Sequence, residues 1–77
     1  MPGIKPIARR KFEKFLAAVG CRLERQKCSH RIFSKPGLTR PVVVPAHSGM
    51  LAPSLISSNL RTLGIASEKY LSILKKL

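Results

Sequence analysis

A chain of 77 residues can bury only one small hydrophobic core, and this limit constrains the fold more than any other feature of the sequence. Two cysteines cannot form the several disulfides that stabilise many short secreted chains. Apolar residues make up 44% of the chain, which is enough for a core of that size. We therefore expect one domain over residues 1–77, built as a layer of helices on a single sheet.

Two segments have the apolar spacing of a helix that covers a core. In residues 8–19, apolar side chains recur at positions i, i+3, i+4 and i+7, and a glycine follows. The same spacing returns in residues 53–63, which begin with a proline and are followed by a glycine. Ser67 is suited to cap a further short segment. The sequence predicts two main helices and a short C-terminal helix.

Three short segments between these helices favour strands. Residues 21–26 and 30–34 are separated by a turn at 27–29, and residues 41–45 contain three successive valines between prolines. We predict an α+β fold of the order α-β-β-β-α, with a three-stranded antiparallel sheet and the helices on one face. The side chains expected in the core are Phe12, Phe15, Leu16, Val43, Ile56, Leu60 and Leu63.

The chain is strongly basic, and its charge is unevenly distributed. It has 15 Lys and Arg against 3 Asp and Glu, a net charge of +12, yet residues 41–60 hold no charged side chain. Such a chain needs an acidic partner, which can be nucleic acid, an anionic membrane surface or an acidic protein. No apolar run is long enough for a signal peptide core or a membrane span. We expect a cytoplasmic protein that does not associate with a membrane and whose cysteines are small buried thiols.

His30 lies in the basic segment, on a predicted strand, and is the first candidate for chemistry. RNA carries its own nucleophile, the 2′-hydroxyl, so its cleavage needs a base, an acid and positive charge on the phosphate, but no metal. An imidazole can accept or give a proton near neutral pH, and Lys27 and Arg31 can hold a phosphate. The alternative is that His30 only ends a strand.

Other polar residues allow more than one interpretation. His47, in the loop after the third strand, could approach the phosphate or hydrogen-bond to nearby backbone. The basic residues of the first helix could extend an RNA track or form a solvated face. A zinc site from Cys21, Cys28, His30 and His47 fits no standard spacing, so we expect no metal and no other cofactor.

Three motifs, taken with the order of the elements, resemble the HicA toxins of bacterial toxin-antitoxin pairs over nearly the whole chain. They are Lys27-Cys28-Ser29-His30, Val42-Val43-Val44-Pro45-Ala46-His47 and Leu63-Gly64-Ile65. The resemblance implies a fold like that of double-stranded RNA-binding domains, metal-independent cleavage of mRNA, and a HicB antitoxin as partner. It implies that His30 is the catalytic histidine of the family's Gly-Ser-His motif.

The chain departs from that family pattern at three positions. Cys28 stands where a glycine is usual, Arg31 where a second histidine is frequent, and Met50 near a common glutamate. We expect the change to Cys28 to alter how closely the backbone approaches a phosphate. The change to Arg31 keeps a positive charge.

We therefore interpret the chain as a toxin that cleaves mRNA as an endoribonuclease, with His30 as the catalytic base or acid. The residues expected to bind RNA are Arg25, Lys27, Ser29, Arg31, Lys35 and His47. The alternative is a non-catalytic module that grips duplex RNA through its backbone and 2′-hydroxyls. A third interpretation is a basic protein that only sequesters an acidic protein.

Overall fold

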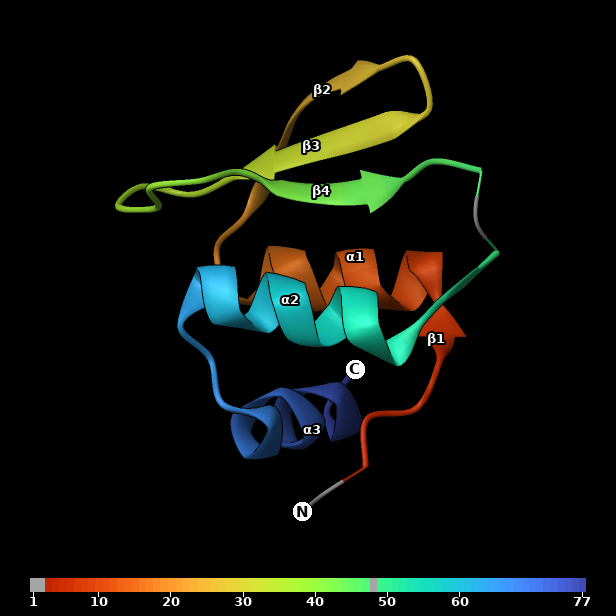
Figure 1. Cartoon of the computed structure of the whole chain (residues 1–77). Coiled ribbons are helices and arrows are strands. Elements are labelled where there is room, and N and C mark those ends of the chain that lie inside the picture. Colours follow the sequence, from red (N-terminus) through yellow and green to blue (C-terminus); the bar gives the residue numbers. More distant parts are fainter. Residues whose placement is uncertain (1–2, 48) are drawn as a thin grey trace.

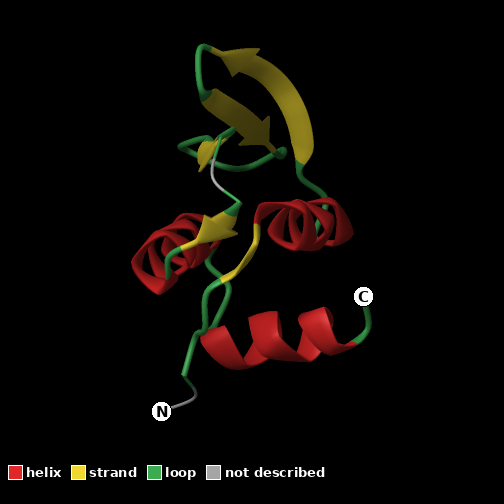
Figure 2. Cartoon of the chain, turned by 90° about the vertical axis from the view of Figure 1, so that its right-hand side faces the viewer, coloured by secondary structure: helices red, strands yellow, loops and turns green. Residues whose placement is uncertain are grey.

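The computed structural model describes residues 3–47 and 49–77. The elements, in order, are β1 (Ile7–Ala8), α1 (Arg9–Ala18), β2 (Arg22–Lys27), β3 (His30–Ser34), β4 (Val42–Pro45), β5 (Met50–Leu51), α2 (Pro53–Leu63) and α3 (Ser67–Lys75). Figure 1 shows three layers, with the sheet above α1 and α2, and α3 beneath them. Figure 2 shows the same layers from the side.

The predicted α+β architecture is confirmed. Strands β2, β3 and β4 form an antiparallel sheet in that order, and α1 and α2 cover one of its faces. The two main helices begin and end within one residue of the predicted bounds. Helix α3 packs on α1 and α2, on their side away from the sheet. The other face of the sheet is therefore not covered by a helix.

The core lies between the sheet and the two main helices. Phe12, Phe15 and Leu16 of α1 are fully buried, as the helical spacing predicts. On α2, Ile56 is fully buried and Leu60 is buried. A hydrogen bond of 3.4 Å from the side-chain Nδ2 of Asn59, also on α2, to a carbonyl oxygen of β4 joins the two layers. The helix layer and the sheet thus share one continuous apolar interior.

The prediction that Val43 lies in the core is wrong. Its neighbours Val42 and Val44 are fully buried, whereas Val43 is only half-buried. Successive side chains of a strand point to opposite faces, so burying its neighbours turns Val43 to the face without helices. Leu63, also expected in the core, is half-buried at the end of α2 and packs at the edge of the core.

A two-residue ladder that the sequence did not predict holds the starts of α1 and α2 together. Strand β1 pairs antiparallel with β5, so that Ile7 lies opposite Leu51. The amide of Arg9 adds a 3.1 Å hydrogen bond to the carbonyl of Gly49. Figure 1 shows that α1 and α2 consequently start at the same end of the molecule.

An aromatic cluster joins α3 to α1. The rings of Phe15 and Tyr70 meet edge to face, with centroids 4.8 Å apart, and the Tyr70 ring lies 6.3 Å from that of Phe12. Such pairs add roughly 0.5–1.5 kcal/mol beyond the area they bury. The Tyr70 hydroxyl is buried and has no hydrogen-bond partner within residues 3–47 and 49–77, and burial raises its pKa to about 12.

The two cysteines lie in different environments. Cys21 is buried, and this burial raises the pKa of its thiol against the opposing charge of Lys35. The expectation that Cys28 is also buried is wrong, because its thiol is exposed in the turn between β2 and β3. Within the described residues, no helix is both long and apolar enough to cross a membrane.

Candidate nucleic-acid interface and catalytic site

The face of the sheet without helices carries His30. In β3, Phe33 is buried toward the helices, and His30, three residues before it along the strand, points the other way. We call this side of the sheet the outer face; its central residues are Arg25, Lys27, His30, Ile32 and Val43. The imidazole of His30 is exposed on this face.

Cross-strand register brings these residues into two neighbouring rows. In one row His30 lies opposite Lys27 of β2 and Pro45 of β4. In the next, Ile32 lies opposite Arg25 and Val43. Directly opposite side chains are close enough to interact, so the ammonium of Lys27 and the imidazole of His30 can face one ligand. A cation and a proton carrier therefore stand side by side on an open surface.

The turn that joins β2 to β3 fixes the position of this pair. Cys28 has a φ of 55°, a left-handed conformation that costs a side chain about 1–2 kcal/mol and costs glycine nothing. This conformation gives a physical reason for the glycine that is usual at this position in HicA toxins. The carbonyl of Ser29 accepts a 2.6 Å hydrogen bond from the amide of Ala46, which ties the turn to the loop after β4.

His47 lies next to that hydrogen bond. It follows Ala46 directly, just as His30 follows Ser29. The loop therefore starts beside the turn and brings the exposed His47 to the same end of the sheet as His30. No hydrogen bond joins the two imidazoles among the described residues.

Two hollows adjoin on the outer face, and both contain Ile32 in their walls. The first, of about 450 Å³, lies beside His30 and Lys27 and has Ile32 and Val43 as its apolar floor. We call it the His30 hollow. The second, of about 250 Å³, lies further along β3 and is bordered by Arg25, Lys35 and Arg40. We call it the basic hollow; Glu24 also lines it.

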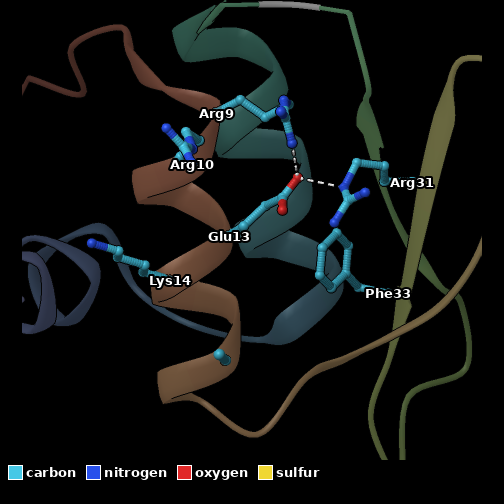
Figure 3. A pocket seen from close by; sticks show the side chains of 7 residues that line it. Arg9, Arg10, Glu13, Lys14, Arg31 and Phe33 are labelled. Carbon is cyan, nitrogen blue, oxygen red and sulfur yellow. Dashed lines mark hydrogen bonds and ion pairs between the residues drawn. The ribbon is translucent and has the colours of Figure 1, made fainter.

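A different cleft lies between α1 and the helix-facing side of β3. Glu13 sits at its centre and accepts hydrogen bonds from Arg9 at 2.6 Å and from Arg31 at 2.9 Å. Figure 3 shows both guanidinium groups turned toward Glu13, whereas Arg10 and Lys14 point away from it. These are the two ion pairs found among residues 3–47 and 49–77. We call this cleft, of about 450 Å³, the helix-side cleft.

Arg31 is therefore not part of the surface around His30. Besides the bond to Glu13, its guanidinium donates to Gln26 at 3.0 Å and lies 5.9 Å from the centroid of the Phe33 ring. The expectation that Arg31 and Lys27 hold one phosphate next to His30 is not met, because adjacent strand residues face opposite sides of the sheet.

The structure brings together most of the other predicted residues. Arg25 and Lys27 lie on the outer face, Lys35 borders the basic hollow, and Ser29 and His47 lie at the end of the sheet where His30 is found. Several other residues that line the two hollows are not among those predicted from the sequence; they include Ile32, Val43 and Arg40. For Ile32 the alternation along β3 contained the signal, since it is two residues from His30.

The zinc alternative finds no support in the arrangement of its four residues. Cys21 lies in the core, whereas Cys28 is exposed at the turn. In the part of the chain that the structure describes, no three His, Cys, Asp or Glu side chains come together as a group that could hold a metal ion.

Comparison with known protein families identifies the chain. The model of a family described as "HicA toxin of bacterial toxin-antitoxin" matches residues 9–65, which is more than half of the chain and includes the whole sheet with α1 and α2. No curated protein matches the chain. The chain therefore belongs to the HicA toxin family, which supports a toxin role and an antitoxin partner.

Proposed function

We propose that this member of the HicA toxin family is an endoribonuclease that cleaves mRNA without a metal, and that His30 is its single catalytic histidine. The whole chain then acts as one ribonuclease domain in the cytoplasm, where mRNA is found. The observation that carries the proposal is the pairing of an exposed imidazole with Lys27 across two strands of an open sheet face. Family membership supports the same activity, because HicA toxins are known as mRNA-cleaving toxins.

The reaction needs only groups that RNA, solvent water and this surface supply. The 2′-oxygen attacks the neighbouring phosphorus, and the bond from phosphorus to the 5′-oxygen breaks. A base takes the proton of the 2′-hydroxyl, and an acid gives a proton to the departing 5′-oxygen. His30 serves as one of these two groups and a solvent water molecule as the other, while the ammonium of Lys27 balances the negative charge that builds on the phosphate.

The other outer-face residues bind the rest of the RNA. Arg25 and Lys35 take flanking phosphates, Ser29 orients the turn, and His47 contacts the strand where the loop meets the turn. The partner is a HicB-type antitoxin. An acidic segment laid over these cations associates fast and covers His30.

The test is cleavage of RNA and of the matching DNA by wild type, His30→Ala and His47→Ala in excess chelator. We expect His30→Ala to lower the rate by about 10²–10⁴, the usual contribution of one positioned proton carrier. His47→Ala should cost about tenfold or less, because it removes one contact to RNA. DNA should not be cleaved.

Because His30 is exposed, a loss of cleavage in His30→Ala can be attributed to the missing imidazole rather than to unfolding. Because its side chain contacts water rather than the core, His30→Ala should keep the melting temperature and circular dichroism spectrum of wild type. Cleavage that survives in His30→Ala, or that acts equally on DNA, refutes the proposal. RNA binding without cleavage in wild type would instead identify a non-catalytic RNA-binding module.

A further inference from the structure

The His30 hollow and the basic hollow differ in chemistry although they share a wall. The floor of the His30 hollow is made of the aliphatic side chains of Ile32 and Val43, which form no hydrogen bonds. The border of the basic hollow holds Arg25, Lys35 and Arg40. One apolar site therefore adjoins one cationic site on the same exposed face.

We propose that the outer face binds a single strand of RNA, with one base packed on Ile32 and Val43 and the adjoining backbone phosphate held by the cations of the basic hollow. The proposal rests on the proposed function and assigns the form of RNA that this site takes. An apolar plane joined to a charged phosphate is the chemistry of one nucleotide. Among the three hollows and clefts described above, these two are the ones that join an apolar floor and unpaired cations beside His30.

The spacing of the rows suits one nucleotide beside the catalytic pair. Ile32 is two residues from His30, and two residues of a strand span about 7 Å. A base on Ile32 and Val43 therefore lies one row away from His30 and Lys27. Its own phosphate can reach His30 while the next phosphate along the strand reaches Arg25.

Duplex RNA cannot use this surface in the same way. In an A-form helix the bases are stacked and paired, and proteins reach mainly the 2′-hydroxyls and phosphates. A base must leave the stack before its face can lie flat on Ile32 and Val43. All the phenylalanine and tyrosine rings of the chain are buried, so the contact to the base is aliphatic and discriminates weakly between bases.

The charge of the outer face supports an anionic occupant. Both ion pairs of the described residues lie in the helix-side cleft, so Arg25, Lys35 and Arg40 are not neutralised by a carboxylate within ion-pair distance. Glu24 lines the basic hollow but pairs with none of these three cations. An acidic protein segment would also satisfy the cations, but it would leave the aliphatic floor of the His30 hollow without a role.

The experiment measures binding with His30→Ala protein, so that the RNA stays intact. The probes are a short oligouridine, the same ribose-phosphate strand without bases, and a duplex of the same length. We expect oligouridine to bind roughly tenfold more tightly than the strand without bases, and more tightly than the duplex. Fluorescence anisotropy gives the three dissociation constants.

Two further substitutions separate the base site from the phosphate site. Val43→Ala removes two methyl groups from the floor and should weaken oligouridine binding about three- to tenfold, without affecting the strand without bases. Arg40→Gln should weaken both strands equally and flatten the salt dependence of affinity by roughly 0.7 to 1 unit. Arg10→Gln, a charge change on α1 outside both hollows, is the control and should leave both strands unaffected.

Equal binding of oligouridine and the strand without bases overturns the base site. A larger effect of Arg10→Gln than of Arg40→Gln moves the binding to the helix side. Tighter binding of polyglutamate than of RNA identifies an acidic protein segment as the occupant. Because binding is measured without cleavage, wild type that cleaves through His30 but shows no base preference refutes only this inference, and base preference without cleavage refutes only the ribonuclease.

Discussion

The two sides of strand β3 hold their positive charges differently. On the helix side, Arg31 is bound to Glu13 together with Arg9, and the side chains of all three are at most 25% exposed. On the outer face, one residue earlier in the chain, His30 is exposed beside Lys27 and makes no ion pair with any residue that the structure describes. Neighbours in a basic sequence thus divide into a structural group and a group free to bind a ligand, and strand alternation makes the division.

Removing one positive charge from each side in turn gives the largest difference in cleavage rate that this comparison predicts. Lys27→Gln removes the ammonium next to His30 and should lower RNA cleavage by roughly tenfold to a hundredfold. Arg31→Gln, the same kind of change on the helix side, should lower cleavage less than about threefold but destabilise the fold. Single-turnover rates and melting curves of both variants test this. Equal losses of cleavage would remove the distinction between the two sides.

Glu13→Gln tests the helix side alone. It leaves Arg9 and Arg31 without their shared carboxylate, and we expect a loss of about 1–2 kcal/mol in the free energy of unfolding, since these groups are partly shielded from water. RNA cleavage by the folded protein should stay within about twofold of wild type. Urea unfolding measures the first quantity, and an increase in stability would contradict the structural role of this cluster.

Tyr70→Phe tests whether the aromatic cluster between α1 and α3 affects stability only. Because the Tyr70 hydroxyl is buried without a partner, its removal should be neutral or stabilise the fold by about 1 kcal/mol, with unchanged cleavage.

The Tyr70 hydroxyl also predicts how the stability of the fold depends on pH. The folded-state pKa of about 12 lies above the ordinary value of 10, so folding favours the protonated form. The resulting stability is present below pH 10 and is lost as the pH rises from 10 to 12. Tyr70→Phe should therefore lose less stability than wild type over this range in urea unfolding experiments. Identical pH profiles would mean that the hydroxyl is solvated.

Cys28→Gly has the smallest expected effect, on the rim of the outer face. Glycine relieves the left-handed backbone strain but also gains freedom in the unfolded chain, which leaves a net stabilisation of about 0.5 kcal/mol. The turn keeps its shape, so His30 and Lys27 keep their pairing and cleavage should be equal to wild type or higher. Cys28→Ala is the control, because it removes the thiol and keeps the strain; a gain in stability equal to that of Cys28→Gly would refute the backbone explanation.

The helices and the three strands of the main sheet can be predicted from the sequence because each has its own pattern of residue types. The helical spacing of Phe12, Phe15 and Leu16 and the valine-rich third strand gave the α+β fold. Which face of a strand each residue occupies was harder to predict, because Val42, Val43 and Val44 show no polar alternation from which to read the register. The two-residue strands β1 and β5 are too short to carry any pattern.

The candidate site could be predicted in part. His30 and Lys27 followed from their types and spacing, since a tight turn brings them opposite each other. The position of Arg31 on the helix side could not be predicted, because its direction depends on Glu13, a tertiary partner 18 positions away that no local pattern reveals. The aliphatic floor of the His30 hollow does not follow from the sequence for a related reason, because nothing in the run of valines shows that Val43 faces away from the core.

Chemical analysis of the new RNA ends tests the proposed ribonuclease most directly. Attack by the 2′-oxygen predicts that wild type, in excess chelator, leaves a 2′,3′-cyclic phosphate on one fragment and a 5′-hydroxyl on the other, and that His30→Ala forms these ends about 10²–10⁴ times more slowly. Fragments with 5′-phosphates, or the same ends at the same rate from His30→Ala, would contradict the assignment of the outer face as the catalytic surface.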